Sequence, residues 1–200
     1  MKNFKNLLLT ISVLLLGATA SFAQDNIVGI TYSMAVPTTG VNNYINEASF
    51  SGVNVEYRKF LNDNLSVGAN IGWNYFQQSN GTQTYYGDNG AITGEEFRDS
   101  DILQTMVTSH YYFGEEGGIR PYIGVGVGAA GNYFDNQVGG IAVVDHYWSF
   151  AVTPEVGVLA PLGGSGTYLL TNVKYNYMTA AKGYGDYGFW SFNIGLAFDF

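Results

Sequence analysis

The sequence predicts an all-β protein, an eight-stranded antiparallel up-and-down transmembrane β-barrel. Three observations support this prediction. A short apolar leader opens the chain, eight later segments alternate between apolar and polar residues, and no later apolar run is long enough for a membrane-spanning helix. In lipid every backbone polar group must be hydrogen-bonded within the protein, so a membrane protein without apolar helices must be a closed barrel.

The first 23 residues predict a cleaved signal peptide. A basic start precedes an apolar stretch from Leu7 to Leu16, and Ser21 and Ala23 supply the small residues of a cleavage site. The apolar stretch of about ten residues is too short to cross ~30 Å of hydrocarbon as a helix. We therefore expect residues 1–23 to be removed and residues 24–200 to form one barrel domain.

Each of the eight segments has one apolar face, because side chains on a strand point alternately to its two faces. In chain order the segments are Val28–Val36, Ser51–Phe60, Leu65–Tyr75, Ile102–Phe113, Pro121–Asn132, Trp148–Ala160, Leu169–Tyr177 and Trp190–Phe200.

The first four segments differ in how clean the alternation is. In the first, Val, Ile, Tyr and Met alternate with Gly, Thr, Ser and Ala. In the second, Val53, Val55 and Tyr57 alternate with polar residues that include Glu56 and Arg58. The third sets Leu, Val, Ile, Trp and Tyr against Ser, Gly and Asn. The fourth has a mixed outer face of Leu, Thr, Val, Ser, Tyr and Phe and is the least apolar.

The last four segments follow the same rule. In the fifth, Ile and Val alternate with Gly124, Gly126 and Gly128, which leave room for bulky side chains opposite, or for a ligand. The sixth sets Trp, Phe, Pro and Val against Ser, Ala, Thr and Glu, and the seventh sets Leu, Val and Tyr against Asn and Lys. The eighth has large apolar residues at every even position and ends on Phe200.

The links between segments alternate in length. The short links are 62–64, 114–119 and 162–166, and the long links are 37–47, 77–101, 133–145 and 179–187. Outer-membrane barrels have short periplasmic turns and long extracellular loops. We therefore expect an outer-membrane protein of a Gram-negative bacterium with both termini in the periplasm. We expect 77–101 to be a solvated, mobile acidic loop, and 77–101 and 133–145 to offer a surface to an extracellular partner.

Outward-facing aromatic residues form two girdles in this arrangement. The girdle nearer the extracellular rim comprises Trp73, Tyr75, Trp148, Phe150, Tyr175, Tyr177, Trp190 and Phe192. The girdle nearer the periplasmic rim comprises Tyr57, Tyr111, Phe113, Phe198 and Phe200. Such girdles mark the membrane–water interfaces of barrels, so we expect contact with outer-membrane lipid and lipopolysaccharide. A secreted β-sandwich would also alternate, with its apolar face in a core, but it would need no girdles.

Inward-facing ionisable residues predict a filled lumen. The candidate network comprises Glu56, Arg58, His110, Tyr122, Glu155 and Lys174. Asp199 is expected to face inward as well. Eight strands enclose just enough space for their own side chains, and confined charges need partners. The network therefore predicts a hydrogen-bonded plug; the alternative is a gate whose ion pairs exchange to open a narrow path.

Composition excludes several classes of site and partner. The 200 residues include 16 Tyr, 13 Phe, 3 Trp and 27 Gly but no Cys, which excludes disulfides and thiolate metal ligands. The formal net charge of −8 argues against a nucleic-acid partner. With only two His, a metal site is poorly supplied, and we expect no metal and no cofactor.

Three motifs carry a resemblance to a known group. Arg120–Gly128 reads Arg-Pro-Tyr-Ile-Gly-Val-Gly-Val-Gly, and Val55–Phe60 is followed closely by Asn64–Gly68. Both resemble strands of small bacterial outer-membrane barrels of the OmpW-, OmpX- and OmpA-barrel-like kind, common in Bacteroidetes-type bacteria. The last strand resembles the signal read by the outer-membrane assembly machinery. Its signal residues are Phe192, Ile194, Leu196, Phe198 and Phe200. The resemblance implies the fold and insertion by that machinery.

Three functions fit such a barrel. The leading hypothesis is a non-enzymatic integral barrel with structural and surface-interaction roles. The alternative is an OmpW-like passive conduit for small apolar solutes that enter between the loops and leave sideways through the wall. A lipid A-modifying enzyme is less favoured. Ser109 and His110 are adjacent and so point to opposite faces, and His146 and Ser149 also differ in parity. We therefore expect no catalytic residues.

Overall fold

The computed structural model describes residues 26–38, 40, 44–87, 90–163 and 166–200. The signal peptide predicted at residues 1–23 lies outside these ranges. Within them, no helix is long and apolar enough to cross a membrane.

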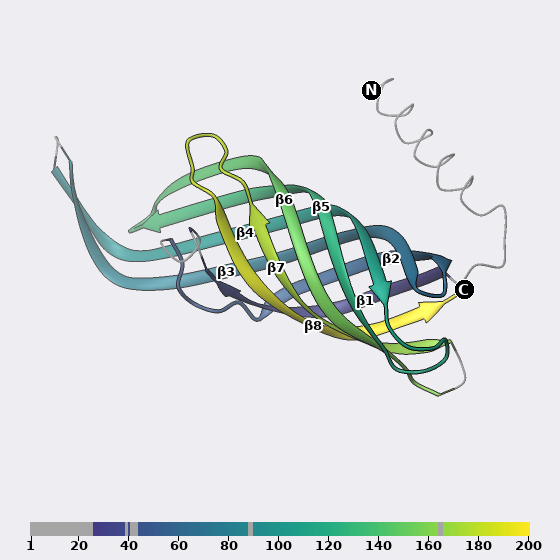
Figure 1. Cartoon of the computed structure of the whole chain (residues 1–200). Helices are drawn as coiled ribbons and strands as arrows, with labels where there is room; N and C mark the ends of the chain where they lie inside the picture. The colour runs from purple at the N-terminus through teal and green to yellow at the C-terminus, as the bar shows by residue number, and fades with distance from the viewer. Residues whose placement is uncertain (1–25, 39, 41–43, 88–89, 164–165) are drawn as a thin grey trace, which may run out of the picture.

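Eight antiparallel strands close into a barrel in chain order, which confirms the predicted fold (Figure 1). The strands are β1 Asn26–Pro37, β2 Ser51–Asn62, β3 Leu65–Gly87, β4 Gly90–Tyr112, β5 Arg120–Val138, β6 Ile141–Pro161, β7 Thr167–Met178 and β8 Tyr187–Asp199. The last strand returns to the first, with Ile27 opposite Asp199 and Pro37 opposite Phe189. Closure pairs the wall strands on both sides and so removes the open sheet edges that attract other chains.

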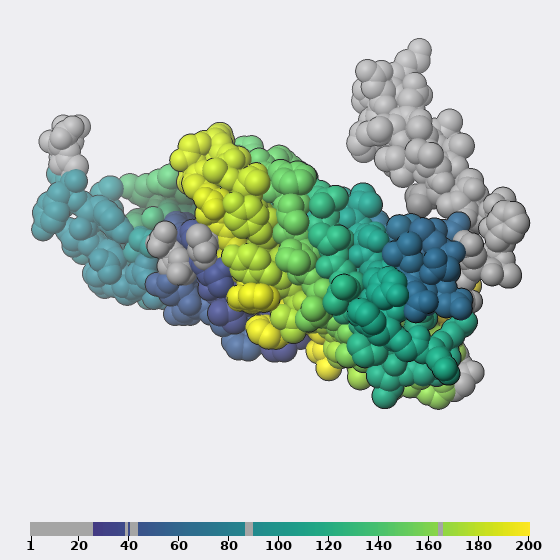
Figure 2. All heavy atoms as spheres, viewed as in Figure 1, coloured from purple at the N-terminus to yellow at the C-terminus, as the bar shows by residue number. Residues whose placement is uncertain are grey.

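The two ends of the barrel are built differently. The short β2–β3, β4–β5 and β6–β7 connections and the carboxyl terminus lie at one end, here called the turn end (Figure 1). The paired ends of β3 and β4 and the β5–β6 connection lie at the opposite end, here called the hairpin end. The β3–β4 hairpin stands out beyond the rest of the molecule in the space-filling view (Figure 2).

The prediction that 77–101 and 133–145 are loops was wrong, because strand pairing continues through both. Pairing between β3 and β4 runs from Tyr75 opposite Asp101 to Gly87 opposite Gly90. Pairing between β5 and β6 continues to Val138 opposite Ile141. Beyond the membrane both faces of a hairpin meet water, so these strands lack the apolar face by which the wall strands were recognised.

Burial alternates along the wall strands as the pattern predicted. The outward-facing Ile71 and Val107 are 54% and 67% exposed, whereas the inward-facing Asn70 and Thr108 beside them are buried. An apolar outer face and a polar inner face are the reverse of a soluble β-sandwich. The large exposed apolar side chains on the wall therefore need lipid as their solvent.

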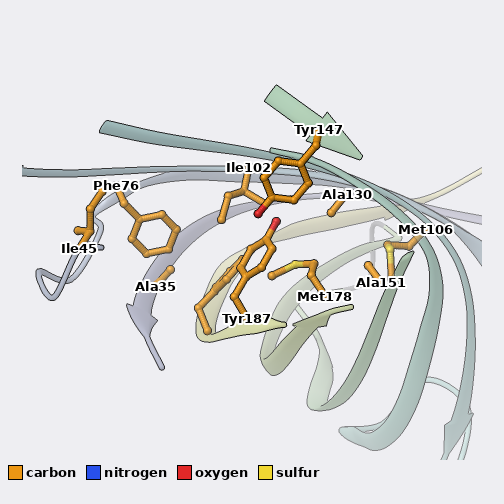
Figure 3. Packing of buried hydrophobic residues seen from close by; sticks show 11 residues of the cluster. Ala35, Ile45, Phe76, Ile102, Met106, Ala130, Tyr147, Ala151, Met178 and Tyr187 are labelled. Carbon is orange, nitrogen blue, oxygen red and sulfur yellow. The ribbon is translucent and has the colours of Figure 1, made fainter. Parts of the chain in front are cut away.

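Two apolar clusters occupy the interior toward its two ends. The cluster toward the hairpin end comprises Ala35, Ile45, Phe76, Ile102, Met106, Ala130, Tyr147, Ala151, Met178, Tyr187 and Phe189 (Figure 3). The cluster toward the turn end comprises Ile27, Phe60, Tyr112, Tyr122, Leu159, Leu170 and Ala197.

Polar side chains lie between the apolar clusters. On β7 the buried residues run from Leu170 through Asn172, Lys174 and Asn176 to Met178. β1 and β8 show the same order, so this part of the interior is layered. A polar layer, which contains all four charges of the candidate network, is enclosed between two apolar layers.

Candidate functional site

Four ionised side chains meet inside the barrel. The Arg58 guanidinium lies 2.7 Å from Glu56 Oε1 and 3.5 Å from Glu155 Oε1. The Lys174 ammonium lies 3.2 Å from Glu155 Oε2 and 3.8 Å from Glu56 Oε2. Each of these side chains is at most 5% exposed. Two cations and two anions cancel one another, as charges removed from water require. We call this group, with His110, Tyr112 and Tyr122, the lumen cluster.

Tyrosines complete the coordination of Arg58. Its Nη1 donates to the Tyr112 hydroxyl at 2.7 Å, and its Nη2 donates to the Tyr122 hydroxyl at 2.8 Å. The guanidinium also lies 4.4 Å from the centroid of the Tyr122 ring. Asn172 donates to the same Tyr122 hydroxyl at 3.1 Å. The structure thus brings together all six residues of the network that was predicted from the sequence, and it adds Tyr112. Tyr112 could have been found from the sequence, because it follows His110 by two residues and so shares its inward face.

Asp199 lies at the open turn end of the barrel. It is paired with the buried Ile27, so it is on the inward side of β8 as expected, but at the rim it is exposed and accepts a hydrogen bond from Tyr168. The sequence reading missed Arg120, which is buried and stacks on Tyr112 and Phe60 at 4.8 and 5.0 Å from the ring centroids. Arg120 is the first residue of β5, one position before the segment expected from its alternation.

Gly124 makes room for the lumen cluster. A Cβ at Gly124 would lie 2.5 Å from the His110 ring and 3.0 Å from Glu155 Cγ. At Gly126 the nearest atoms, on Thr108 and Met106, would be 3.4 to 3.5 Å away, an ordinary contact. The space opposite these two glycines is therefore taken up by the protein's own side chains.

A Ser–His–Glu chain lies within the cluster. His110 Nδ1 is 3.2 Å from Ser66 Oγ, and His110 Nε2 is 2.6 Å from Glu155 Oε1. This connectivity resembles that of a hydrolase triad, in which the base activates a nucleophile that reaches a substrate. Ser66 is 0% exposed, and Glu155 is held by two cations as well. The Ser66–His110–Glu155 contacts therefore hold the lumen cluster together. In the described ranges, no three His, Asp or Glu residues are grouped for a metal ion.

A pocket opens at the hairpin end, next to the apolar cluster of Figure 3. Its volume is about 590 Å³. It is lined by Gly40, Tyr44, Phe134, Asn136, Val143, Asp145, Tyr147, Tyr184, Gly185, Asp186 and Tyr187. We call it the mouth pocket. The sequence reading missed it because its walls come from hairpins and connections that were expected to be loops.

A latch holds one wall of the mouth pocket in place. Lys182 donates to Asp145 Oδ1 at 2.8 Å and to the His146 carbonyl at 3.1 Å. The Tyr184 hydroxyl donates to Asp145 Oδ2 at 2.8 Å. These hydrogen bonds lower the pKa of Asp145 to about 2. Lys182 has φ of 53°, an unusual value for a residue with a side chain, so the latch holds a tight turn.

A second set of contacts fastens the β1–β2 connection to the projecting hairpin. Glu96 accepts hydrogen bonds from Asn80, Tyr85 and Arg98 at 2.8 to 3.1 Å. Arg98 also donates to the Tyr44 carbonyl at 3.1 Å. Burial raises the pKa of Glu96, but these donors outweigh burial and leave it below its usual value. The projecting hairpin is thus anchored at its base.

The predicted interfacial aromatics share the outer face. Trp73, Trp148, Phe150 and Trp190 are exposed on the wall, and Tyr75, Tyr175 and Tyr177 are partly covered. Trp73 Nε1 donates to Asp101 at 3.0 Å, and Tyr175 packs against Trp190 at 4.8 Å between centroids. Rings with an apolar body and a hydrogen-bonding edge suit a membrane interface.

A closed ring of eight antiparallel strands with an apolar outer face and a filled interior defines the class of small outer-membrane β-barrels, and solved structures of that class match this chain in fold. Neisserial surface protein A, from Neisseria, matches with a TM-score of 0.55 and 14% identity over 88% of this chain and 97% of its own. The outer membrane protein OprG of Pseudomonas aeruginosa matches with a TM-score of 0.51 and 15% identity over 89% and 96%. Neither a protein-family model nor a curated protein matches the sequence. The chain therefore has the fold of these outer-membrane barrels, and its Bacteroidetes-type origin stays a prediction.

Proposed function

We propose that the protein is an integral outer-membrane barrel that does not conduct, and that acts as a structural and surface-interaction protein. The lumen cluster supports this proposal most directly. A passing ion would have to separate Arg58 and Lys174 from Glu56 and Glu155, and then cross an apolar layer on either side. Breaking a buried ion pair by removing one partner costs about 3–5 kcal/mol, so a spontaneous opening would be rare.

Planar-bilayer recording of the purified barrel tests the closed lumen. We expect no stable open level in the wild type, and channel events in the double variant Glu56→Ala/Lys174→Ala, which removes one anion and one cation together. Stable openings in the wild type would instead support the gate and overturn the plug.

The proposed orientation follows from the two ends of the barrel. We place the turn end and both termini in the periplasm and the hairpin end outside the cell. The signal peptide at 1–23 and the closing-strand signal at Phe192, Ile194, Leu196, Phe198 and Phe200 fit export and insertion by the assembly machinery. The outward aromatics would then contact outer-membrane lipid and lipopolysaccharide. Protease added to intact cells should cut only at the hairpin end.

The projecting β3–β4 hairpin is the proposed surface for an extracellular partner. Pairing of β2 with β3 ends at Ser51 opposite Tyr75, so β3 beyond Tyr75 has a strand partner on the β4 side only. The segment from Gln77 to Gly87 carries no charge and no proline to protect that edge. Free backbone groups on such an edge can accept an added strand from another chain.

Shortening the hairpin tests this surface. Replacing residues 79–95 by a two-residue turn should leave a folded barrel, because the wall pairs lie below it. We expect the attachment of intact cells to protein-coated surfaces to fall in the shortened variant. A Thr82→Pro variant, which blocks one backbone donor without removing the hairpin, serves as the finer probe. Unchanged attachment in both variants would contradict the proposed surface.

One observation favours the OmpW-like conduit as a second candidate. The β6–β7 ladder lacks the pairs between Val152–Tyr177 and Glu155–Lys174, at Thr153 and Pro154. Proline has no N–H to donate, so the wall has fewer hydrogen bonds there. Small apolar solutes could enter at the mouth pocket and leave sideways through this interruption. A disulfide between Thr153→Cys and Asn176→Cys should then abolish solute entry into liposomes under oxidising conditions only, whereas equal entry in both redox states would exclude this path.

A further inference from the structure

Aromatic rings form the walls of the mouth pocket in two nearly perpendicular orientations. Tyr147 and Tyr184 are stacked at 4.8 Å and 9°, and Phe134 lies almost parallel to both, at 20° and 18°. Tyr187 stands at 74° to Phe134, and Tyr44 stands at 88° to it. All five rings line the mouth pocket, so its wall is aromatic on more than one side, a setting in which organic cations are bound.

The charge on the pocket lining is negative. Asp145 and Asp186 are its ionisable carboxylates, and no Lys, Arg or His is among its described lining residues. The Arg98 guanidinium lies 5.3 Å from the centroid of the Tyr44 ring, so one wall ring already has a cation beside it. Lys182 pairs with Asp145 from outside the lining. Asp186 accepts a hydrogen bond from the Tyr177 hydroxyl at 3.0 Å. Because this hydroxyl is neutral, it does not balance the negative charge of Asp186. Asp186 is exposed and has no cationic partner among the described residues, and such a carboxylate beside an aromatic wall favours a cationic guest.

The pocket lining also contains an acceptor without a donor. Asn136 Oδ1 is buried and has no hydrogen-bond partner among the described residues. Buried polar atoms are rarely left unsatisfied, and a ligand is one way to satisfy them. An acceptor at this place suits a ligand that brings an N–H group.

We propose that the mouth pocket binds a small organic cation, a protonated amine carried on an apolar or aryl body. The ring faces would contact the cationic carbon and nitrogen groups, Asp186 would balance the charge, and Asn136 Oδ1 would accept an N–H. The volume of about 590 Å³ lies within the usual range of small-molecule sites, about 300–1,000 Å³. This binding site is independent of the closed lumen and of the hairpin edge.

Calorimetric titration of the full barrel with benzylamine tests the proposal, with benzyl alcohol as the neutral analogue. The barrel is held in phosphatidylglycerol nanodiscs, because choline headgroups would compete for an aromatic cage, and empty nanodiscs correct for binding to lipid. We expect saturable binding of benzylamine that is about tenfold tighter than that of benzyl alcohol, a difference equivalent to about 1.4 kcal/mol.

Variants assign the effect to the pocket. Asp186→Asn should weaken benzylamine binding about fivefold and leave benzyl alcohol binding unchanged, because only the charge is lost. Tyr184→Leu should weaken both ligands, since it removes a wall. Glu95→Gln and Tyr86→Leu, on the projecting hairpin, are the matched controls and should bind like the wild type. A difference in gel mobility between unheated and heated samples confirms that each variant is folded.

Three outcomes would overturn the proposal. Equal affinity for the amine and the alcohol would make the pocket an apolar site. Tighter binding of a neutral hexose than of benzylamine would make it a sugar site. Benzylamine binding that survives both Asp186→Asn and Tyr184→Leu would place the cation elsewhere.

Discussion

The lumen cluster and the mouth pocket use the same chemistry to opposite effect. Both combine carboxylates with tyrosines, but in the lumen cluster each carboxylate is paired with a cation and the space is filled. At the mouth a volume of about 590 Å³ remains, and Asn136 keeps an unsatisfied acceptor. The difference lies in closure. Eight paired strands hold lumen side chains at a fixed, short separation. The walls of the mouth stand beyond the closed ring, where individual contacts such as the latch at Asp145 hold them without filling the space between them.

Removing Glu155 should have the largest effect on stability, because it disrupts the ion pairs of the lumen cluster. Glu155 contacts Arg58, Lys174 and His110, so Glu155→Leu leaves two buried cations with a single anion. We expect a loss of about 3–5 kcal/mol in the free energy of unfolding, measured by urea titration in lipid vesicles. Glu155→Gln, which keeps the shape, is the control for packing. The cluster would be judged unimportant for stability if Glu155→Leu unfolded at the wild-type urea concentration.

A side chain at Gly124 should have a smaller effect, because it crowds the cluster without removing a charge. Gly124→Val would place its Cβ against His110 and Glu155. Overpacking of this kind costs about 1–3 kcal/mol, measured in the same titration. Gly126→Ala is the matched control, since its Cβ would make only ordinary contacts with Thr108 and Met106. Equal stability of the two variants would show that the space at Gly124 is not needed.

Acid should have the smallest effect, and it acts at the mouth. The latch lowers the pKa of Asp145 to about 2 from an ordinary 3.8, so its contribution is complete above about pH 4 and is lost as the pH falls toward 2. Because Tyr184 is held on Tyr147 by this latch, the near-ultraviolet circular dichroism of tyrosine should be constant from pH 7 to about 4 and decline below it.

The Asp145→Asn variant supplies the control for the acid experiment. Its amide does not titrate, so its near-ultraviolet signal should show no transition between pH 4 and 2. A transition of the same size in wild type and variant would assign the change to another group.

The sequence predicted the structure correctly where a region faces lipid and less well where it faces water. Tyr57, beside Glu56 and Arg58, shows the period-two pattern, and this pattern predicted both the wall strand and the inward charges. Tyr85 and Ile92 lie on equally regular strands, but both faces of their hairpin are exposed, so apolar and polar residues do not alternate there. Lys182, which holds the mouth pocket by its latch, lies in a connection where neither periodicity nor spacing could place it beside Asp145.

The sequence by itself determined the number of wall strands, their direction, their outer and inner faces and the four ionised residues of the lumen cluster. This was possible because lipid outside the barrel requires apolar residues on the outer face, and the confined lumen requires small or polar residues on the inner face. Each wall strand therefore shows the alternation in its sequence. Only the tertiary structure decided which charges touch, how far the hairpins project and where the aromatic rings of Phe134, Tyr147 and Tyr184 meet. Those contacts depend on the stagger between strands far apart in the chain, which local alternation does not record.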